Sequence, residues 1–74
     1  MSMTLRQKQV LQLLAEGQTI KEVATSLAIT QRSAAYYKYE IMRDHSLKSN
    51  SDIVTFAIRQ RLVPLPPAVS GTVN

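Results

Sequence analysis

The sequence predicts an all-α fold, a small four-helix domain that contains a helix-turn-helix. Apolar residues recur at the three- and four-residue spacing of helices in four stretches. A Ser or Thr that can cap a helix precedes each stretch. Residues 28–30, which separate the second stretch from the third, are long enough only for a turn. Two consecutive helices joined by so short a turn predict the helix-turn-helix.

The first helix is predicted over residues 5–16. Thr4 and Gln7 have the spacing of a capping box, in which each side chain accepts a hydrogen bond from the other residue's backbone N–H. Gly17 is the residue type that most often follows the end of a helix. The inward arc of this helix consists of Val10, Leu11, Leu13 and Leu14.

A second, shorter helix is predicted over residues 20–27. Thr19 and Glu22 repeat the capping-box spacing. Ala24 lies on the inward side, where a larger side chain would push the axes of two packed helices apart. Ile29 is expected to fill the turn that follows with an apolar side chain.

The third helix, predicted over residues 30–43 with Thr30 as its N-cap, has two different sides. At about 100° per residue, the side that requires a core carries Ala34, Tyr37 and Ile41. The opposite side is basic, aromatic and able to form hydrogen bonds, and it carries Arg32, Ala35, Tyr36, Tyr39 and Arg43. Such a side suits phosphates and base edges better than lipid, so this helix is predicted to enter a DNA groove.

The last helix is predicted to run from Ser49, its N-cap, to about Gln60, with Asp52 at the third helical position. Its apolar residues occupy an arc of about 200°, wider than the roughly 100° that docking onto one core requires. Ile53 and Ala57 are therefore expected to be buried, while one edge of the arc stays available to a second subunit. The expected dimer interface consists of Ser51, Val54, Thr55 and Ile58.

Length and composition narrow the choice of function. The chain has 74 residues, which predicts one domain over residues 1–63, and residues 64–74, with three prolines and no charge, are predicted to be a disordered tail. Nine basic residues against five acidic ones give a net charge of +4, which favours polyanionic partners. The absence of an apolar run of membrane-spanning length and of a signal peptide predicts a cytoplasmic protein.

Neither catalysis nor a metal site is predicted, and no cofactor is expected. Glu22, Glu40 and Asp52 each fit a cap or a solvated helix face and have no partner nucleophile in the pattern. His45 has no second ligand at a suitable spacing, and the chain has no cysteine.

Four segments together resemble the DNA-binding domain of the LuxR/FixJ/GerE family over residues 3–63. They are MTLRQKQVLQLLAEG, TIKEVATSLAIT, RSAAYYKYEIM and LKSNSDIVTFAIRQRLV. The resemblance implies double-stranded DNA binding through the third helix and dimerisation through the fourth. Most members carry an upstream receiver or sensor domain, so the chain is expected to be the output domain of a response regulator or a stand-alone regulator, as a few members are. The positions at which several members read bases correspond to Ala35, Tyr36 and Tyr39.

Some positions depart from the usual family pattern. Gln7 stands where members often have Glu, and Tyr37 stands where His is common. After the third helix, Asp44, His45 and Ser46 replace a frequent Lys-Leu-Gly, so a polar ring takes the place of an apolar anchor. Of the three base-reading positions, only the two tyrosines can form side-chain hydrogen bonds, so the target sequence does not follow from the resemblance.

The expected DNA contacts divide into phosphate and base contacts. Lys21 and Arg32 lie in the first turns of the second and third helices, which face the DNA backbone when a helix-turn-helix is bound. Lys38 and Lys48 fit phosphate contact and plain solvation equally well. Gln31 suits adenine or is merely solvated. The full predicted set is Thr19, Lys21, Thr30, Gln31, Arg32, Ala35, Tyr36, Lys38, Tyr39, Arg43 and Lys48.

Two functions remain open from the residues alone. The first is a sequence-specific DNA-binding domain that regulates transcription as a weak homodimer stabilised on DNA. The second is a protein-interaction module on the same scaffold, which docks through the last helix and has lost DNA reading. Salt dependence separates them, because a DNA binder that neutralises several phosphates weakens steeply as salt rises and apolar docking does not.

Overall fold

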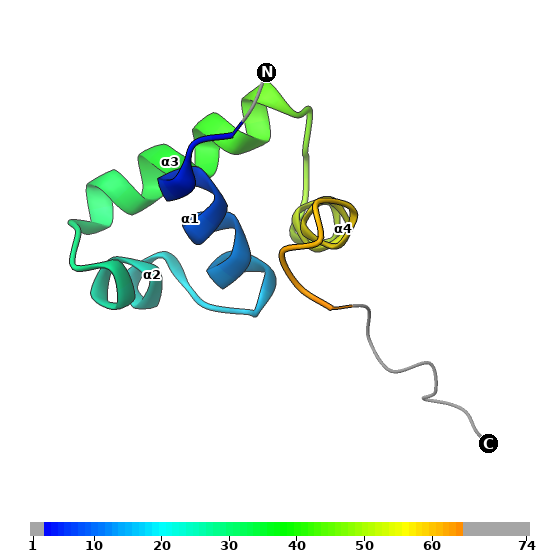
Figure 1. Cartoon of the computed structure of the whole chain (residues 1–74). Helices are drawn as coiled ribbons and strands as arrows, with labels where there is room; N and C mark the ends of the chain where they lie inside the picture. Colours follow the sequence, from blue (N-terminus) through cyan, green and yellow to red (C-terminus); the bar gives the residue numbers. More distant parts are fainter. Residues whose placement is uncertain (1–2, 65–74) are drawn as a thin grey trace.

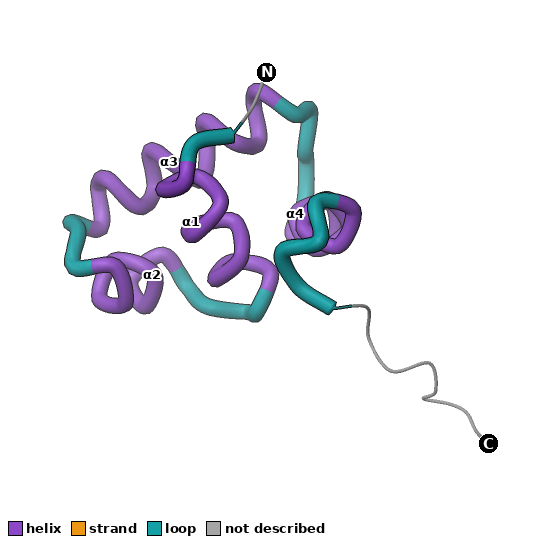
Figure 2. The backbone as a smooth tube through the Cα atoms, in the orientation of Figure 1, coloured by secondary structure: helices purple, strands orange, loops and turns teal. Residues whose placement is uncertain are grey.

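Four helices make up most of residues 3–64, which are the residues that the structure, a computed structural model, describes (Figure 1). Loops alone join these helices, and the described range contains no strand (Figure 2). The all-α prediction is confirmed, and the first and last helices each end one residue earlier than predicted. The helices are α1 (Leu5–Ala15), α2 (Ile20–Leu27), α3 (Gln31–Asp44) and α4 (Asn50–Arg59).

The first two helices begin with the predicted capping boxes. Thr4 Oγ1 accepts a hydrogen bond from Gln7 N at 3.1 Å, and Thr4 N donates to Gln7 Oε1 at 2.9 Å. In the same way, Thr19 Oγ1 accepts from Glu22 N at 3.2 Å, and Thr19 N donates to Glu22 Oε1 at 2.8 Å. Each box satisfies two backbone N–H groups at the start of a helix, where no carbonyl of the helix can reach them.

The last two helices begin with single caps. Ser33 N donates to Thr30 Oγ1 at 3.0 Å, and Asp52 N donates to Ser49 Oγ at 3.1 Å, as the sequence predicts. The Asp52 carboxylate, however, accepts from Lys48 N at 2.8 Å, one residue before the N-cap. Asp52 therefore holds both the first turn of α4 and the connection that leads into it.

Three of the four helices end at a left-handed residue that is not glycine. Ala28, Ser46 and Arg61 follow α2, α3 and α4 with φ of 55°, 56° and 59°. After α1 the residue with positive φ is a glycine, Gly17, at φ 93°. A left-handed conformation costs an L-residue about 1–2 kcal/mol, so these turns require a compensating contact.

The compensating contact is an apolar residue directly after each left-handed one. Ile29, Leu47 and Leu62 each donate a backbone N–H to a carbonyl five residues earlier, at 3.0, 2.8 and 3.0 Å. This bond closes the Schellman motif, whose apolar residue packs back onto the helix. All three side chains pack against the core. Ile29 thus fills the turn as predicted, and two equivalent residues do the same after α3 and α4.

The core draws on all four helices. Helix α1 packs against the other three, and α2 also packs against α3. In Figure 1, α1 accordingly lies between the α2–α3 pair and α4. The predicted burial of Ile53 and Ala57 is confirmed. The buried residues are Val10, Leu11, Val23, Ala24, Ala34, Ile41, Ile53 and Ala57.

His45 fills the junction between α3 and α4. It is the C-cap of α3, and its ring centroid lies 4.4 Å from that of Phe56 on α4, with the ring planes 31° apart. The residue that looked like a polar substitute for an apolar anchor therefore anchors the junction through its ring face.

Within residues 3–64 no helix is both long and apolar enough to cross a membrane. The predicted tail, residues 64–74, lies outside the described residues apart from Pro64.

Replacing Ser46 by glycine should raise the free energy of unfolding by about 0.5–1 kcal/mol. Relief of the left-handed strain outweighs the extra backbone entropy that glycine has in the unfolded chain. Urea unfolding measures the difference. Ser51→Gly is the matched control, since Ser51 is exposed inside α4 and its replacement should lower stability by a similar amount. Equal losses in both variants would contradict the argument.

Candidate nucleic-acid interface

Helix α3 divides into a buried side and an exposed side, as the sequence predicts. Ala34 and Ile41 are 1% and 2% exposed. Tyr37 is half-buried and packs against the core, whereas Tyr36 and Tyr39 are 61% and 60% exposed. Among the described residues, the large hydrophobic side chains that are exposed are these two tyrosines and Leu5. The surface of the two tyrosines is therefore open to a partner.

The N-terminal half of the same outward side is cationic and polar. Gln31 and Arg32, the first two residues of α3, are exposed, and the first turn contains no acidic residue. Thr30 Oγ1 donates to Ser33 Oγ at 3.0 Å while it caps Ser33 N, so the hydroxyl of the cap is used within the helix start. Free N–H groups at a helix start favour an anion.

The C-terminal end of α3 adds one more cation. Arg43 Nε lies 3.2 Å from the Asp44 carboxylate, but the two side chains are 72% and 45% exposed. An ion pair this open to water is weak, so Arg43 can exchange it for another anion at little cost. Nearer the middle of α3, Lys38 Nζ lies 5.7 Å from the centroid of the Tyr39 ring.

One flank of α3 borders an open cleft of about 550 Å³. The cleft joins three residues that the sequence predicted separately, Thr19, Lys21 and Lys38, and Asn50 of α4 also lines it. The helix starts of α2 and α4 thus meet beside two lysines. The two lysine ammonium groups favour a phosphate, whereas Glu22 and Asp52 place a carboxylate in the first turns of α2 and α4. Lys48 does not line this cleft but lies exposed just before the N-cap of α4.

The opposite flank of α3 is tied to the start of α1 by Glu40. Gln7 Nε2 donates to Glu40 Oε1 at 2.9 Å, and the Tyr36 hydroxyl donates to Glu40 Oε2 at 3.2 Å. The prediction that Glu40 occupies a cap or a solvated face is therefore wrong: the residue is half-buried and bonded between helices. No local pattern signals this contact, because its partners are 33 residues apart.

Tyr36 also touches the core side of its own helix. Its ring lies edge-on to that of Tyr37, with centroids 6.0 Å apart and planes at 70°. The Glu40 hydrogen bond and this ring contact favour this orientation of Tyr36 although most of its surface is exposed.

The predicted dimer residues form one stripe along α4. Ser51 and Thr55 are exposed, whereas Val54 and Ile58 are half-buried. Neither Val54 nor Ile58 belongs to the described side chains that pack against the core. Their partial burial leaves apolar surface at the stripe.

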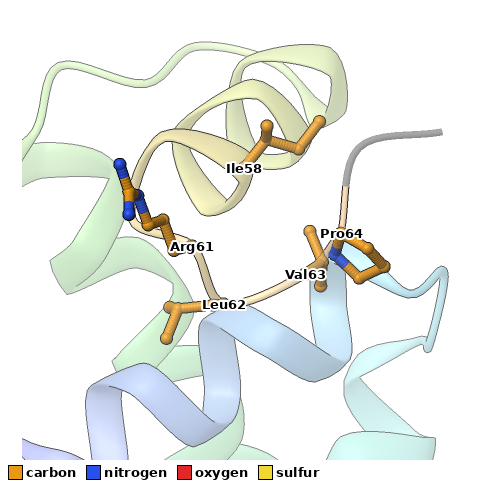
Figure 3. Close-up of a pocket in the computed structure, with 5 residues that line it drawn as sticks. All are labelled: Ile58, Arg61, Leu62, Val63 and Pro64. Atoms are coloured by element: carbon orange, nitrogen blue, oxygen red, sulfur yellow. The ribbon is translucent and has the colours of Figure 1, made fainter.

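Each of the two apolar residues of this stripe lines a cleft. Val54 lines the cleft that also holds Lys38. Ile58 lines another, whose remaining lining is formed by the chain that follows α4 and includes Leu62, Val63 and Pro64 (Figure 3). The remaining apolar surface of the two side chains therefore faces open clefts.

Among residues 3–64 no group of three or more His, Cys, Asp or Glu side chains lies close enough together to hold a metal ion.

A short helix, a three-residue turn and a longer helix with an exposed polar side define a helix-turn-helix protein. Residues 1–57 match the GerE family, described as bacterial regulatory proteins of the luxR family. The chain belongs to this family. The resemblance seen in the sequence is thereby confirmed, and membership supports DNA-binding transcription regulation as the general role.

Two relatives carry the same domain within longer chains. The chain is 31% identical over 58 residues to the oxygen regulatory protein NreC of Staphylococcus carnosus (strain TM300). The matched segment covers 78% of this chain and 27% of NreC. It is 30% identical over 57 residues to the uncharacterized response regulatory protein YgeK of Escherichia coli (strain K12). This matched segment covers 77% of this chain and 39% of YgeK. The chain thus spans well under half the length of either relative. No solved structure gives a significant match.

Proposed function

We propose that this chain binds double-stranded DNA in a sequence-specific way and regulates transcription, with α3 in the major groove. The observation that carries the proposal is the division of α3, which buries Ala34 and Ile41 and exposes a continuous cationic and aromatic side. A major groove admits one α-helix and presents base edges and flanking phosphates to it. The uncharged tyrosines at the centre and cations at both ends of α3 match that arrangement.

The proposed contacts follow from position on this surface. Ala35, Tyr36 and Tyr39, with Gln31 at the helix start, would face base edges. Phosphate contacts would come from the helix starts and from the cations around α3. The cations would be Lys21, Arg32, Lys38, Arg43 and Lys48, and Thr19 and Thr30 mark the helix starts, where their hydroxyls act as caps.

The relatives suggest the wider setting. YgeK is named a response regulatory protein and NreC an oxygen regulatory protein, and each is much longer than the matched segment. We propose that the domain acts as an output domain joined to, or working with, a receiver or sensor domain. A chromosomal target would place it in the cytoplasm.

A protein-interaction module that docks through α4 is the alternative. One observation favours it: Val54 and Ile58 keep apolar surface beside open clefts. The same surface serves a DNA-bound dimer equally well. Titration of the domain with random and selected duplexes at several salt concentrations separates the two functions, since only DNA binding releases counterions. Affinity for duplexes that does not change with salt would rule out the DNA proposal.

Arg32→Ala should weaken binding about equally for all duplexes and make the salt slope shallower by roughly one unit. Arg32 is exposed in the first turn of α3, where a phosphate contact carries no sequence information. Fluorescence anisotropy against salt measures both quantities. Arg59→Ala removes the same charge from the last turn of α4 and should change the slope less. Identical behaviour of the two variants would refute a specific contact by Arg32.

Tyr39→Ala should reduce discrimination between the selected duplex and a scrambled one by about 1–3 kcal/mol without altering the fold. Tyr39 lies on the exposed side of α3 and makes no core contact, so its loss should not affect stability. Competition binding with the two duplexes gives the difference. Tyr39→Phe keeps the ring and separates stacking from hydrogen bonding. Recovery of the same motif by parent and Tyr39→Ala would show that Tyr39 reads no base.

Val54→Asp should leave the free domain folded and monomeric but abolish cooperative occupancy of two half-sites. A few hundred Å² of apolar contact at about 25 cal/mol per Å² is largely offset by lost rigid-body freedom, so dimerisation needs the high effective concentration that DNA supplies. Sedimentation and mobility shifts on one and two half-sites test this. Gln12→Asp, an exposed change on α1 with the same charge difference, is the control. Undiminished cooperativity in Val54→Asp would place the dimer contact elsewhere.

A further inference from the structure

Three side chains form a hydrogen-bonded chain from the start of α1 to the exposed side of α3. Gln7 accepts a hydrogen bond from Thr4 N through Oε1 at 2.9 Å and donates to Glu40 through Nε2 at 2.9 Å. Both ends of the Gln7 amide are therefore occupied, which fixes its orientation. The other oxygen of Glu40 accepts from the Tyr36 hydroxyl at 3.2 Å.

This chain has a definite direction. An ionised carboxylate can only accept hydrogen bonds, and a phenol hydroxyl has a single proton to donate. The proton of Tyr36 is therefore directed at Glu40. What the Tyr36 oxygen still offers to a partner is its lone-pair side, and the residue is 61% exposed. Toward anything that approaches α3, Tyr36 is an acceptor.

We infer that Glu40 is a positioning residue that makes Tyr36 select an exocyclic amino group in the major groove. Adenine N6 and cytosine N4 are the donors there, whereas guanine O6 and thymine O4 are acceptors that would meet the Tyr36 oxygen unfavourably. Tyr36 would thus prefer adenine or cytosine over guanine or thymine at the base it contacts. The inference rests on the proposed function, since it specifies the base chemistry that the same surface reads.

Gln7 orients Glu40 in this arrangement. A glutamate at this position could still cap α1, because its carboxylate can accept from Thr4 N. It would, however, bring a second carboxylate to the 2.9 Å contact with Glu40 and repel it. The neutral amide of Gln7 supplies an acceptor at one end and a donor at the other. The same side chain therefore caps α1 and holds Glu40.

The Glu40→Gln substitution distinguishes a positioning role of Glu40 from a purely structural one, because only the positioning role predicts a changed base preference. The substituted glutamine is nearly isosteric with glutamate, and its carbonyl would take the bond from Gln7 Nε2. Its amide N–H would then donate to the Tyr36 oxygen, and the Tyr36 proton would turn toward the DNA. We expect the preference to invert, so that guanine or thymine is selected at a position where the parent selects adenine or cytosine. In the parent the preference should be about tenfold in affinity, which is within the range of one good base contact.

Selection from a randomised duplex library, followed by affinity measurement on duplexes that differ at one position, makes the comparison. Tyr36→Phe should lose the preference at that position and keep the rest of the motif. Glu40→Gln should invert it. In a Gln7→Ala background, Glu40→Gln should relax the preference to less than about threefold, because nothing then orients the new amide. Circular dichroism and melting temperature confirm that each variant folds.

The outcomes separate this inference from the proposed function. A parent that enriches no motif contradicts sequence-specific DNA binding itself. A parent motif that Tyr36→Phe alters at one position, but that Glu40→Gln leaves unchanged, overturns only the role of Glu40. A change caused by Glu40→Gln that persists in a Tyr36→Phe background also overturns it, because Glu40 would then act on the base directly. If Glu40→Gln does not fold, Tyr36→Phe decides: loss of a preference for guanine or thymine refutes the inference.

Discussion

The packing of α3 against the rest of the domain is the constraint on which the proposed surface depends. Ala34 and Ile41 are almost completely buried, and their burial fixes the rotation of the helix about its axis. A small residue at Ala34 lets α3 approach its neighbours closely. Every outward residue follows from that rotation, since neighbours on a helix differ by about 100°. A core contact thus determines which side chains a partner meets.

So small a domain has little core with which to hold that packing, and its turns supply the rest. Within residues 3–64 eight residues are buried, and Ile29, Leu47 and Leu62 add apolar contacts from the turns. Each of these three follows a left-handed residue that is not glycine, so packing of the turn outweighs local strain at all three helix ends. The ends of the helices are therefore part of the core and not merely connections.

Helix positions and the two sides of α3 could be predicted from the sequence because they depend on near neighbours. Caps act over three residues and helical periodicity over three or four. The pair Thr19 and Glu22, and the series Ala34, Tyr37 and Ile41, are therefore visible in the chain itself. The contact of Gln7 with Glu40 and that of His45 with Phe56 could not be predicted in this way. They depend on how α1 and α4 are placed against α3, which no local spacing specifies.

The two flanks of α3 differ in charge, and this difference bears on how the helix would lie in a groove. Lys21 and Lys38 border the cleft on one flank, whereas on the other flank Glu40 shares a cleft with Arg43, which offsets part of its charge. Two phosphate strands border a major groove, and a carboxylate close to either would be repelled. In the proposed complex the cleft flank would therefore approach one strand closely, and on the other flank only Arg43 would reach a phosphate while Glu40 stays further away. Helix α3 would then lie closer to one strand of the duplex than to the other, which leaves Tyr36 room to reach a base edge on the Glu40 flank.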